Sequence, residues 1–238
     1  VIKLTSEYKS VEEENVVERR TELADSRGDK PVVLVADDNP DMLSFIVRQL
    51  ESNYVVVTAN DGVEALKVLD NQEVSLVVSD VVMPRMDGFE LCKVIKSKLD
   101  YSHIPVILLT AKTNIQSKIE GLELGADAYI EKPFSVEYLQ ACIANLINSR
   151  EKLRQAFAQS PFVAANTMAL TKADEEFMKK LNEIIQNNFH NPDFSMDDIV
   201  DSLNMSRSNF YRKIKGVLDL SPNEYLRLER LKRAAQLL

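Results

Sequence analysis

The sequence has few cysteines or histidines and no long apolar run. Its two cysteines, Cys92 and Cys142, both lie in apolar helical patterns, and its two histidines, His103 and His190, are far apart in the chain. A histidine-based metal cluster is therefore not expected, and we predict that both cysteines are buried, reduced thiols. No apolar stretch approaches the roughly 18 residues typical of a transmembrane helix, and the first residues do not follow a signal-peptide pattern.

The size and composition are typical of a globular protein with one or two domains. The chain has 238 residues, of which 45% are hydrophobic and 28% are charged. It starts with Val1 and ends in "RLERLKRAAQLL", a helical pattern without a stop signal. We therefore expect the chain to be a piece of a longer protein.

Charge is distributed unevenly along the chain. Residues 31–150 hold 10 basic and 17 acidic side chains, a net charge of −7, whereas residues 206–238 hold 8 basic and 3 acidic ones, a net charge of +5. An acidic module followed by a basic tail indicates different partners for the two parts.

The region 31–150 alternates short β-branched runs with helical periods, after a polar segment at 1–30. The predicted strands are Val32–Ala36, Tyr54–Thr58, Val74–Ser79, Val106–Leu109 and Ala128–Ile130. The predicted helices are Pro40–Glu51, Gly62–Leu69, Phe89–Lys98, Asn114–Leu124 and Ser135–Asn148. This alternation predicts an α/β fold, a doubly wound five-stranded parallel sheet.

The last helix of this region has two open interpretations. The spacing of five apolar residues is close to a coiled-coil repeat: Leu139, Ile143, Leu146, Leu153 and Phe157. Either one long helix runs on and pairs with a second copy, or the first three residues pack on the sheet and the rest belong to a helical linker at 151–171.

Acidic side chains stand at the ends of predicted strands. The stretch "PVVLVADDNPDM" places Asp37 and Asp38 after the first strand, and Asp80 ends the third. Thr110 ends the fourth strand and Lys132 follows the fifth. In the strand order 2-1-3-4-5, all five residues converge on the carboxyl edge of the sheet, where open parallel sheets bind ligands.

Three carboxylates in one small site require a cation between them. An oxygen-only donor set suits Mg²⁺, which also accepts a phosphate oxygen as a ligand. A lysine and a hydroxyl across the site can hold other phosphoryl oxygens. One carboxylate can then act as the nucleophile and form an aspartyl phosphate.

Residues 31–150 resemble the receiver domain of bacterial response regulators, which has a flavodoxin-like fold. The matching features are "DD", the "D" of "SDVVMPRMDG", the "T" of "LLTAK" and the "K" of "EKPF". The resemblance implies that Asp80 accepts a phosphoryl group from a phosphohistidine. It also implies that Mg²⁺ is held by Asp37, Asp38, Asp80 and the backbone carbonyl of Val82.

The same resemblance assigns roles to residues of the last two strands. Thr110 and Lys132 would bind the phosphoryl group, and Tyr129 matches the family's aromatic switch position. The bond Lys132-Pro133 would be cis. An aspartate-dependent phosphatase or phosphotransferase is the rival class, but families resembling haloacid dehalogenases space their first-strand aspartates by one residue, and here the acids are adjacent.

The C-terminal part reads as helical, with a short helix at Met196–Leu203, a turn at 204–205 and a second helix at 206–216. Phe210 and Ile214 form the apolar face of the second helix. Its opposite face carries Arg207, Ser208, Tyr211, Arg212 and Lys215. This pattern favours a DNA-binding helix-turn-helix over a helical hairpin with a solvated charged face.

Residues 172–238 resemble the first half of an AraC-type DNA-binding domain, through "SRSNFYRKIK", the following glycine and "LSPNEYLRLERLKRAAQLL". The resemblance implies that Ser208, Tyr211 and Arg212 reach base edges, whereas Arg207 and Lys215 touch phosphates. The second helix-turn-helix of that family would follow Leu238.

A receiver followed by an AraC-type domain resembles the end of a hybrid two-component protein. In that family a sensor and a histidine kinase precede the receiver, so residues 1–30 would be a linker or the tail of a kinase. The expected partners are a histidine kinase on the same or another chain, double-stranded DNA and a second copy on activation, without membrane contact by this chain. The expected location is cytoplasmic, or the cytoplasmic end of a membrane-anchored hybrid. The alternative is a stand-alone phosphoreceiver or phosphate sink whose basic tail binds protein.

Overall fold

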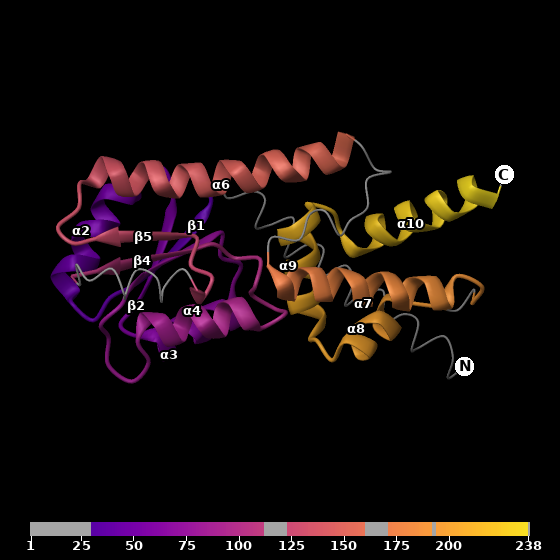
Figure 1. Cartoon of the computed structure of the whole chain (residues 1–238), viewed down its shortest axis with the longest axis horizontal. Coiled ribbons are helices and arrows are strands. Elements are labelled where there is room, and N and C mark those ends of the chain that lie inside the picture. Colours follow the sequence, from indigo (N-terminus) through magenta and orange to yellow (C-terminus); the bar gives the residue numbers. More distant parts are fainter. Residues whose placement is uncertain (1–29, 112–122, 160–170, 192–193, 238) are drawn as a thin grey trace, which may run out of the picture.

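The computed structural model describes residues 30–111, 123–159, 171–191 and 194–237. Figure 1 shows a sheet-containing unit followed by a helical unit. The strands are β1 (Val32–Ala36), β2 (Val55–Ala59), β3 (Leu76–Asp80), β4 (Val106–Thr110) and β5 (Ala128–Glu131). The helices of this unit are α2 (Pro40–Leu50), α3 (Gly62–Asn71), α4 (Gly88–Ser97) and α6 (Val136–Gln159).

The five strands form one parallel sheet in the order β2-β1-β3-β4-β5, which confirms the predicted topology. Alternate residues of the central strands face two separate cores. Helices α3 and α4 contribute to one core, and α2 and α6 contribute to the other, so each face of the sheet is covered (Figure 1). All residues of β3 and β4 are buried, as expected for inner strands of a doubly wound sheet.

Most predicted elements occur with shifts of one or two residues at their ends. The second strand begins at Val55 rather than Tyr54, and the third begins at Leu76 rather than Val74. Asn39 caps α2 as its side chain accepts hydrogen bonds from the amides of Asp41 and Met42. The predicted helix at 114–124 falls largely outside the described residues. The peptide Lys132-Pro133 is cis, as the family resemblance implied.

Helix α6 is one continuous helix of 24 residues that ends at Gln159. Leu139 and Ile143 are buried against the sheet, and Leu146 is partly buried there. Leu153, which lies beyond the sheet, is 36% exposed. The helix therefore runs on, as the first interpretation predicted, while its first three apolar residues pack on the sheet, as the second predicted. Pairing with a second copy stays a prediction.

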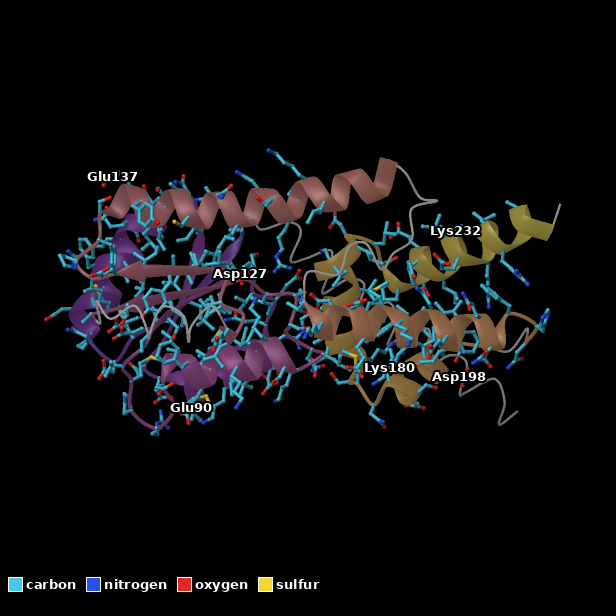
Figure 2. All side chains as sticks on the ribbon, viewed as in Figure 1. Glu90, Asp127, Glu137, Lys180, Asp198 and Lys232 are labelled. Carbon is cyan, nitrogen blue, oxygen red and sulfur yellow. The ribbon has the colours of Figure 1, made fainter. Side chains whose placement is uncertain are left out.

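The helical unit consists of α7 (Lys172–Asn188), α8 (Met196–Leu203), α9 (Arg207–Leu218) and α10 (Pro222–Leu237). Its core includes Phe210 and Ile214, which the sequence predicted to form the apolar face of the second helix, together with Phe177, Leu181 and Ile185 of α7. Ser195 and Asp198 form a capping box at the start of α8, and Figure 2 labels Asp198 on this helix. Ser206 caps α9, which extends two residues beyond the predicted end at Gly216.

Both cysteines are free thiols, as predicted. Cys92 lies on the inner face of α4 and is fully buried in the core, and burial raises the pKa of its thiol to about 11. Cys142 is only partly buried on α6, so its predicted burial is incomplete. In the described part of the chain, no helix is both long and apolar enough to cross a bilayer.

The start of α4 is packed directly on the end of β3. A Cβ added at Gly88 would lie 2.1 Å from the carbonyl oxygen of Asp80, and the Gly88 amide donates to the carbonyl of Val81 at 3.0 Å. Asp87 and Glu90 form a capping box at the same point, with Glu90 labelled in Figure 2. A glycine is therefore needed for α4 to approach the site edge this closely.

We predict that Gly88→Ala lowers the free energy of unfolding by about 2–3 kcal/mol, because the added methyl meets backbone atoms that cannot rotate away. Urea unfolding followed by circular dichroism measures this change. Lys93→Ala, on the exposed face of the same helix, is the control and should stay within about 0.5 kcal/mol. Equal stabilities of the two variants would contradict this account of the helix start.

Candidate phosphoryl-transfer site

The three predicted acids come together at the carboxyl edge of the sheet. Carboxylate oxygens of Asp37, Asp38 and Asp80 all lie within 4.8 Å of one another. Asp37 is 1% exposed and Asp80 is 9% exposed, whereas Asp38 is exposed to solvent. The group thus has a buried base and an open side, which suits a site that must admit a ligand.

Backbone amides hold two of these carboxylates in place. The Asn39 amide donates to Oδ1 of Asp37 at 2.9 Å, and the Val81 amide donates to Oδ1 of Asp80 at 2.9 Å. Pairing of β1 with β3 sets the two strand ends side by side, with Ala36 opposite Ser79. Sheet register and local turns therefore position the acids together.

Lys132 spans the site from the end of β5. Its Nζ lies 2.9 Å from Oδ2 of Asp37 and 3.1 Å from Oδ1 of Asp80. Burial alone would lower the pKa of this ammonium, but the hydrogen bond to Asp37 and the charge of Asp80 raise it above its ordinary value. Lys132 is therefore a firmly charged cation beside the carboxylates.

The negative charge of the Asp80 carboxylate is only partly compensated by its neighbours. Burial raises its pKa, and the opposing effect of Lys132 does not cancel this. Because the pKa is raised on folding, ionisation of Asp80 destabilises the folded protein as the pH rises through that pKa. A cation or a phosphoryl group with its counter-ion would relieve this cost.

Thr110 ends β4 next to β3 and is fully buried. Its carbonyl accepts a hydrogen bond from the Lys132 amide at 2.6 Å, which ties the ends of β4 and β5 together. Val82 follows Asp80 and is 60% exposed. The Tyr129 hydroxyl is buried without a hydrogen-bond partner among the described residues. The structure thus places Thr110, Lys132 and Val82 at the acid edge, with Tyr129 on the neighbouring strand.

The donor set fits a hard divalent cation. Carboxylate oxygens are the ligands that Mg²⁺ prefers, and Mg²⁺ retains several waters, so a few carboxylates on an open edge suffice. Among the described residues, these three acids form the cluster of ligating side chains close enough to share one ion. The predicted position of the metal site therefore has the chemistry that it needs.

The second set of predicted residues lies on α9, with one departure from expectation. Ser208 is exposed, and Arg207, Tyr211 and Lys215 are partly exposed, as a DNA-contacting face requires. Arg212 is also partly exposed, but its guanidinium is engaged within the chain. Its guanidinium donates hydrogen bonds to backbone carbonyls of the sheet-containing unit, those of Leu69, Asp70 and Gln72.

Sequence reasoning missed a buried ion pair between Lys213 of α9 and Asp174 of α7. Lys213 is fully buried, and its ammonium bonds both the Asp174 carboxylate and the Ser102 hydroxyl. Asp174 lies in the first turn of α7, where its amide bonds the Thr171 hydroxyl. Burial lowers the pKa of Lys213 to about 8. A lysine next to the buried positions Phe210 and Ile214 of α9 was the available signal.

The comparisons with known proteins agree with both parts of the chain. The response regulator receiver domain model matches residues 33–144. The model for bacterial regulatory helix-turn-helix proteins of the AraC family matches residues 185–227. The chain therefore combines a receiver domain with an AraC-type helix-turn-helix.

Curated relatives share one or both parts. Histidine kinase P4 of Formosa agariphila is 38% identical over 210 residues, which cover 88% of this chain and 15% of that protein. The sensor histidine kinase TmoS of Ectopseudomonas mendocina is 35% identical and covers 64% of this chain and 16% of its own length. The transcriptional regulatory protein PhoP of Bacillus subtilis is 40% identical over 50% of this chain and 49% of its own length.

Among solved structures, the receiver domain of Francisella response regulator 1452 is similar, with 36% identity and a TM-score of 0.48. That match covers 50% of this chain and 98% of the Francisella chain. This chain spans only a small fraction of the two kinases and about half of PhoP.

We predict that Mg²⁺ stabilises the protein through Asp80. At about 100 times its Kd, Mg²⁺ should raise the free energy of unfolding by ~2.7 kcal/mol, and Asp80→Asn should lose most of this gain. Without Mg²⁺, Asp80→Asn should be more stable than the wild type, because it removes a buried charge that folding disfavours. Urea unfolding in EDTA and in Mg²⁺ tests both points, and equal Mg²⁺ effects in the two proteins would contradict the assignment.

Proposed function

We propose that Asp80 is the phosphoacceptor of this regulator and that its phosphorylation controls DNA binding by α8 and α9. The observation that carries this proposal is the position of Asp80, at the end of β3 between two further carboxylates and Lys132. An ionised carboxylate is a ready nucleophile and needs no general base.

In the proposed reaction, an Asp80 carboxylate oxygen attacks the phosphorus of a phosphohistidine. The P–N bond breaks as the new P–O bond forms, and the released imidazole nitrogen keeps the electron pair of the broken bond. The product is an acyl phosphate on Asp80. Lys132 would hold a phosphoryl oxygen, and the Thr110 hydroxyl would bind another. The donor is a histidine kinase on the same chain or on a separate one, as the similarity to two histidine kinases supports.

Asp37, Asp38, Asp80 and the Val82 carbonyl would hold Mg²⁺ in this site. The ion would supply positive charge between the carboxylates and the phosphoryl oxygens. The residues of the chain provide the rest. Backbone amides fix the orientation of Asp37 and Asp80, and Lys132 contacts both from the opposite side.

The helix-turn-helix would enter the major groove of double-stranded DNA with α9. Ser208, Tyr211 and Arg212 are the proposed base contacts, and Arg207 and Lys215 the proposed phosphate contacts. The AraC family match favours DNA over a protein as the partner of this basic region. A homodimer on activation, through the extended α6, stays a prediction from the near-heptad spacing.

We predict that Asp80 alone takes up a phosphoryl group, or beryllofluoride as its mimic, and only with Mg²⁺. Intact-mass measurement after incubation with a small phosphodonor detects the adduct. Asp80→Asn should abolish labelling, while Asp41→Asn, an exposed aspartate in the first turn of α2, should leave it unchanged. Substantial labelling of the Asp80→Asn protein would show that another residue is the acceptor.

We predict different effects from two basic residues of α9. Arg212→Ala should lower the ratio of affinities for a selected and a scrambled duplex by an amount equivalent to roughly 1–3 kcal/mol, because an arginine fork can pair with guanine. Lys215→Ala should weaken both duplexes alike and reduce the salt slope by about one.

Fluorescence titrations at several salt concentrations measure these quantities, with the selected site taken from a random pool by the wild-type chain. Any conformational step that weakens binding to both duplexes by the same factor cancels in the ratio of the two affinities. An unchanged ratio for Arg212→Ala would mean that Arg212 does not read bases.

A further inference from the structure

The guanidinium of Arg212 is bound at the carboxyl end of α3. Its Nη1 donates to the carbonyl oxygens of Leu69 at 2.8 Å and Gln72 at 3.0 Å, and its Nη2 donates to that of Asp70 at 2.8 Å. The Asn209 side chain accepts a further bond from Nη2 at 2.5 Å. Four donor interactions of this fork are therefore used within the chain.

This position is a favourable one for a cation. The last carbonyls of a helix lack partners within the helix and carry its partial negative charge. The last turn of α3, Val68–Asn71, has no basic side chain of its own. Arg212 supplies that charge from the helix-turn-helix, so α9 caps a helix of the receiver.

A second contact lies beside the first. The loop at residues 98–105, between α4 and β4, is named here the docking loop. Its Ser102 hydroxyl accepts a bond from Lys213 at 2.7 Å and donates to Asp174 at 2.7 Å. All three side chains are almost completely buried. The receiver thus completes a buried polar cluster whose two charges belong to the helical unit.

Close backbone packing adds a third contact. A Cβ added at Gly216 of α9 would lie 2.2 Å from Cδ2 of His103 in the docking loop. Leu99 of the same loop packs on the core of the helical unit. Helix α9 therefore contacts the receiver through three residues, Arg212, Lys213 and Gly216, and not through a single side chain.

We infer that this arrangement is an autoinhibited state in which the receiver withholds Arg212 from DNA. This inference rests on the proposed function, because it requires α9 to be the DNA-reading helix. The guanidinium cannot fork to a base while its Nη1 and Nη2 groups donate to the carbonyls at the end of α3. DNA binding then requires α9 to leave the end of α3 and the docking loop.

The seat of α9 lies at the opposite edge of the sheet from Asp80. A five-residue strand spans about 16 Å, so the phosphoryl site and the seat do not touch. Two helices connect them. Helix α4 starts with Gly88 on the Asp80 carbonyl and ends where the Lys98 carbonyl accepts from the Ser102 amide. Helix α3 starts at Gly62, whose amide donates to the Met86 carbonyl at 3.2 Å. It ends at the carbonyls that accept hydrogen bonds from Arg212.

This geometry provides a route for coupling. The segment 81–87 joins Asp80 to α4 and also contacts the start of α3. A shift of this segment on phosphorylation would move both helices, and with them both parts of the seat. Because packed helices move as rigid bodies between discrete arrangements, the release of α9 needs no unfolding of the receiver.

The test uses the whole chain with receiver-side substitutions that leave α9 intact. Asp70→Lys places a cation at the end of α3, where it repels Arg212 and also removes the bond from the Tyr101 hydroxyl. Ser102→Ala removes the hydroxyl between Lys213 and Asp174. Glu51→Lys is the charge-matched control, because Glu51 is an exposed residue that caps α2.

We predict that Asp70→Lys binds a fluorescent mixed-sequence duplex at least about tenfold more tightly than Glu51→Lys, and that Ser102→Ala gains affinity over the wild type. Adding duplex to the wild type should also speed hydrogen exchange at the amides of Ser102 and Ile104. Equal affinities of Asp70→Lys and Glu51→Lys, or unchanged exchange in a chain saturated with duplex, would overturn the inference.

These outcomes separate the inference from the proposed function. If Asp80 is labelled normally and the wild type binds duplex, but the receiver-side variants gain nothing, the seat is not inhibitory and the proposed function stands. If Asp70→Lys loosens the docking loop but neither it nor the wild type binds duplex, the proposed DNA-binding role fails. Absence of labelling at Asp80 would remove the phosphoacceptor role alone.

Discussion

The mutual repulsion of Asp37, Asp38 and Asp80 is the constraint on which the rest of this structure depends. One oxygen atom from each of the three carboxylates lies within 4.8 Å of the other two. Burial also disfavours the ionised form of Asp80. The sheet holds them there through strand register, backbone amides and Lys132. Because the negative charge of this site is incompletely neutralised, the site favours binding of a cation together with a phosphoryl group. Such binding can shift the segments around the site.

The segments around the acids are the starts of α3 and α4, and the ends of the same helices hold α9. Helices α3 and α4 therefore have the acidic site at their starts and the contacts with α9 at their ends. Docking uses interactions that are strong but reversible: a cap on helix carbonyls, a buried ion pair completed by a hydroxyl, and a glycine contact. The residue that would contribute most to base recognition, Arg212, is also the residue most engaged in docking.

The sequence predicted what depends on local pattern and strand order. Alternating strands and helices indicated the doubly wound sheet, and the acids at strand ends indicated the site, because parallel strands end at one edge. The starts of the helices at Pro40, Met196 and Arg207 were predicted to within one residue, and the structure shows that Asn39, Ser195 and Ser206 cap them. Arg212 lies on the partly exposed face of α9 as predicted, but its contacts with the receiver were not predicted, because helical periodicity defines the faces of a helix and not which neighbour contacts them. The Lys213–Asp174 pair was missed for the same reason: its members lie 39 residues apart and their contact depends on tertiary packing.

Hydrogen exchange in the docking loop tests the coupling between Asp80 and α9 most directly. Beryllofluoride with Mg²⁺ should speed exchange at the amides of Ser102 and Ile104 in the wild type, because the end of α4 moves and α9 leaves its seat. The same addition should have no effect on Asp80→Asn. Unchanged protection of both amides in wild-type protein that carries beryllofluoride on Asp80 would contradict the account.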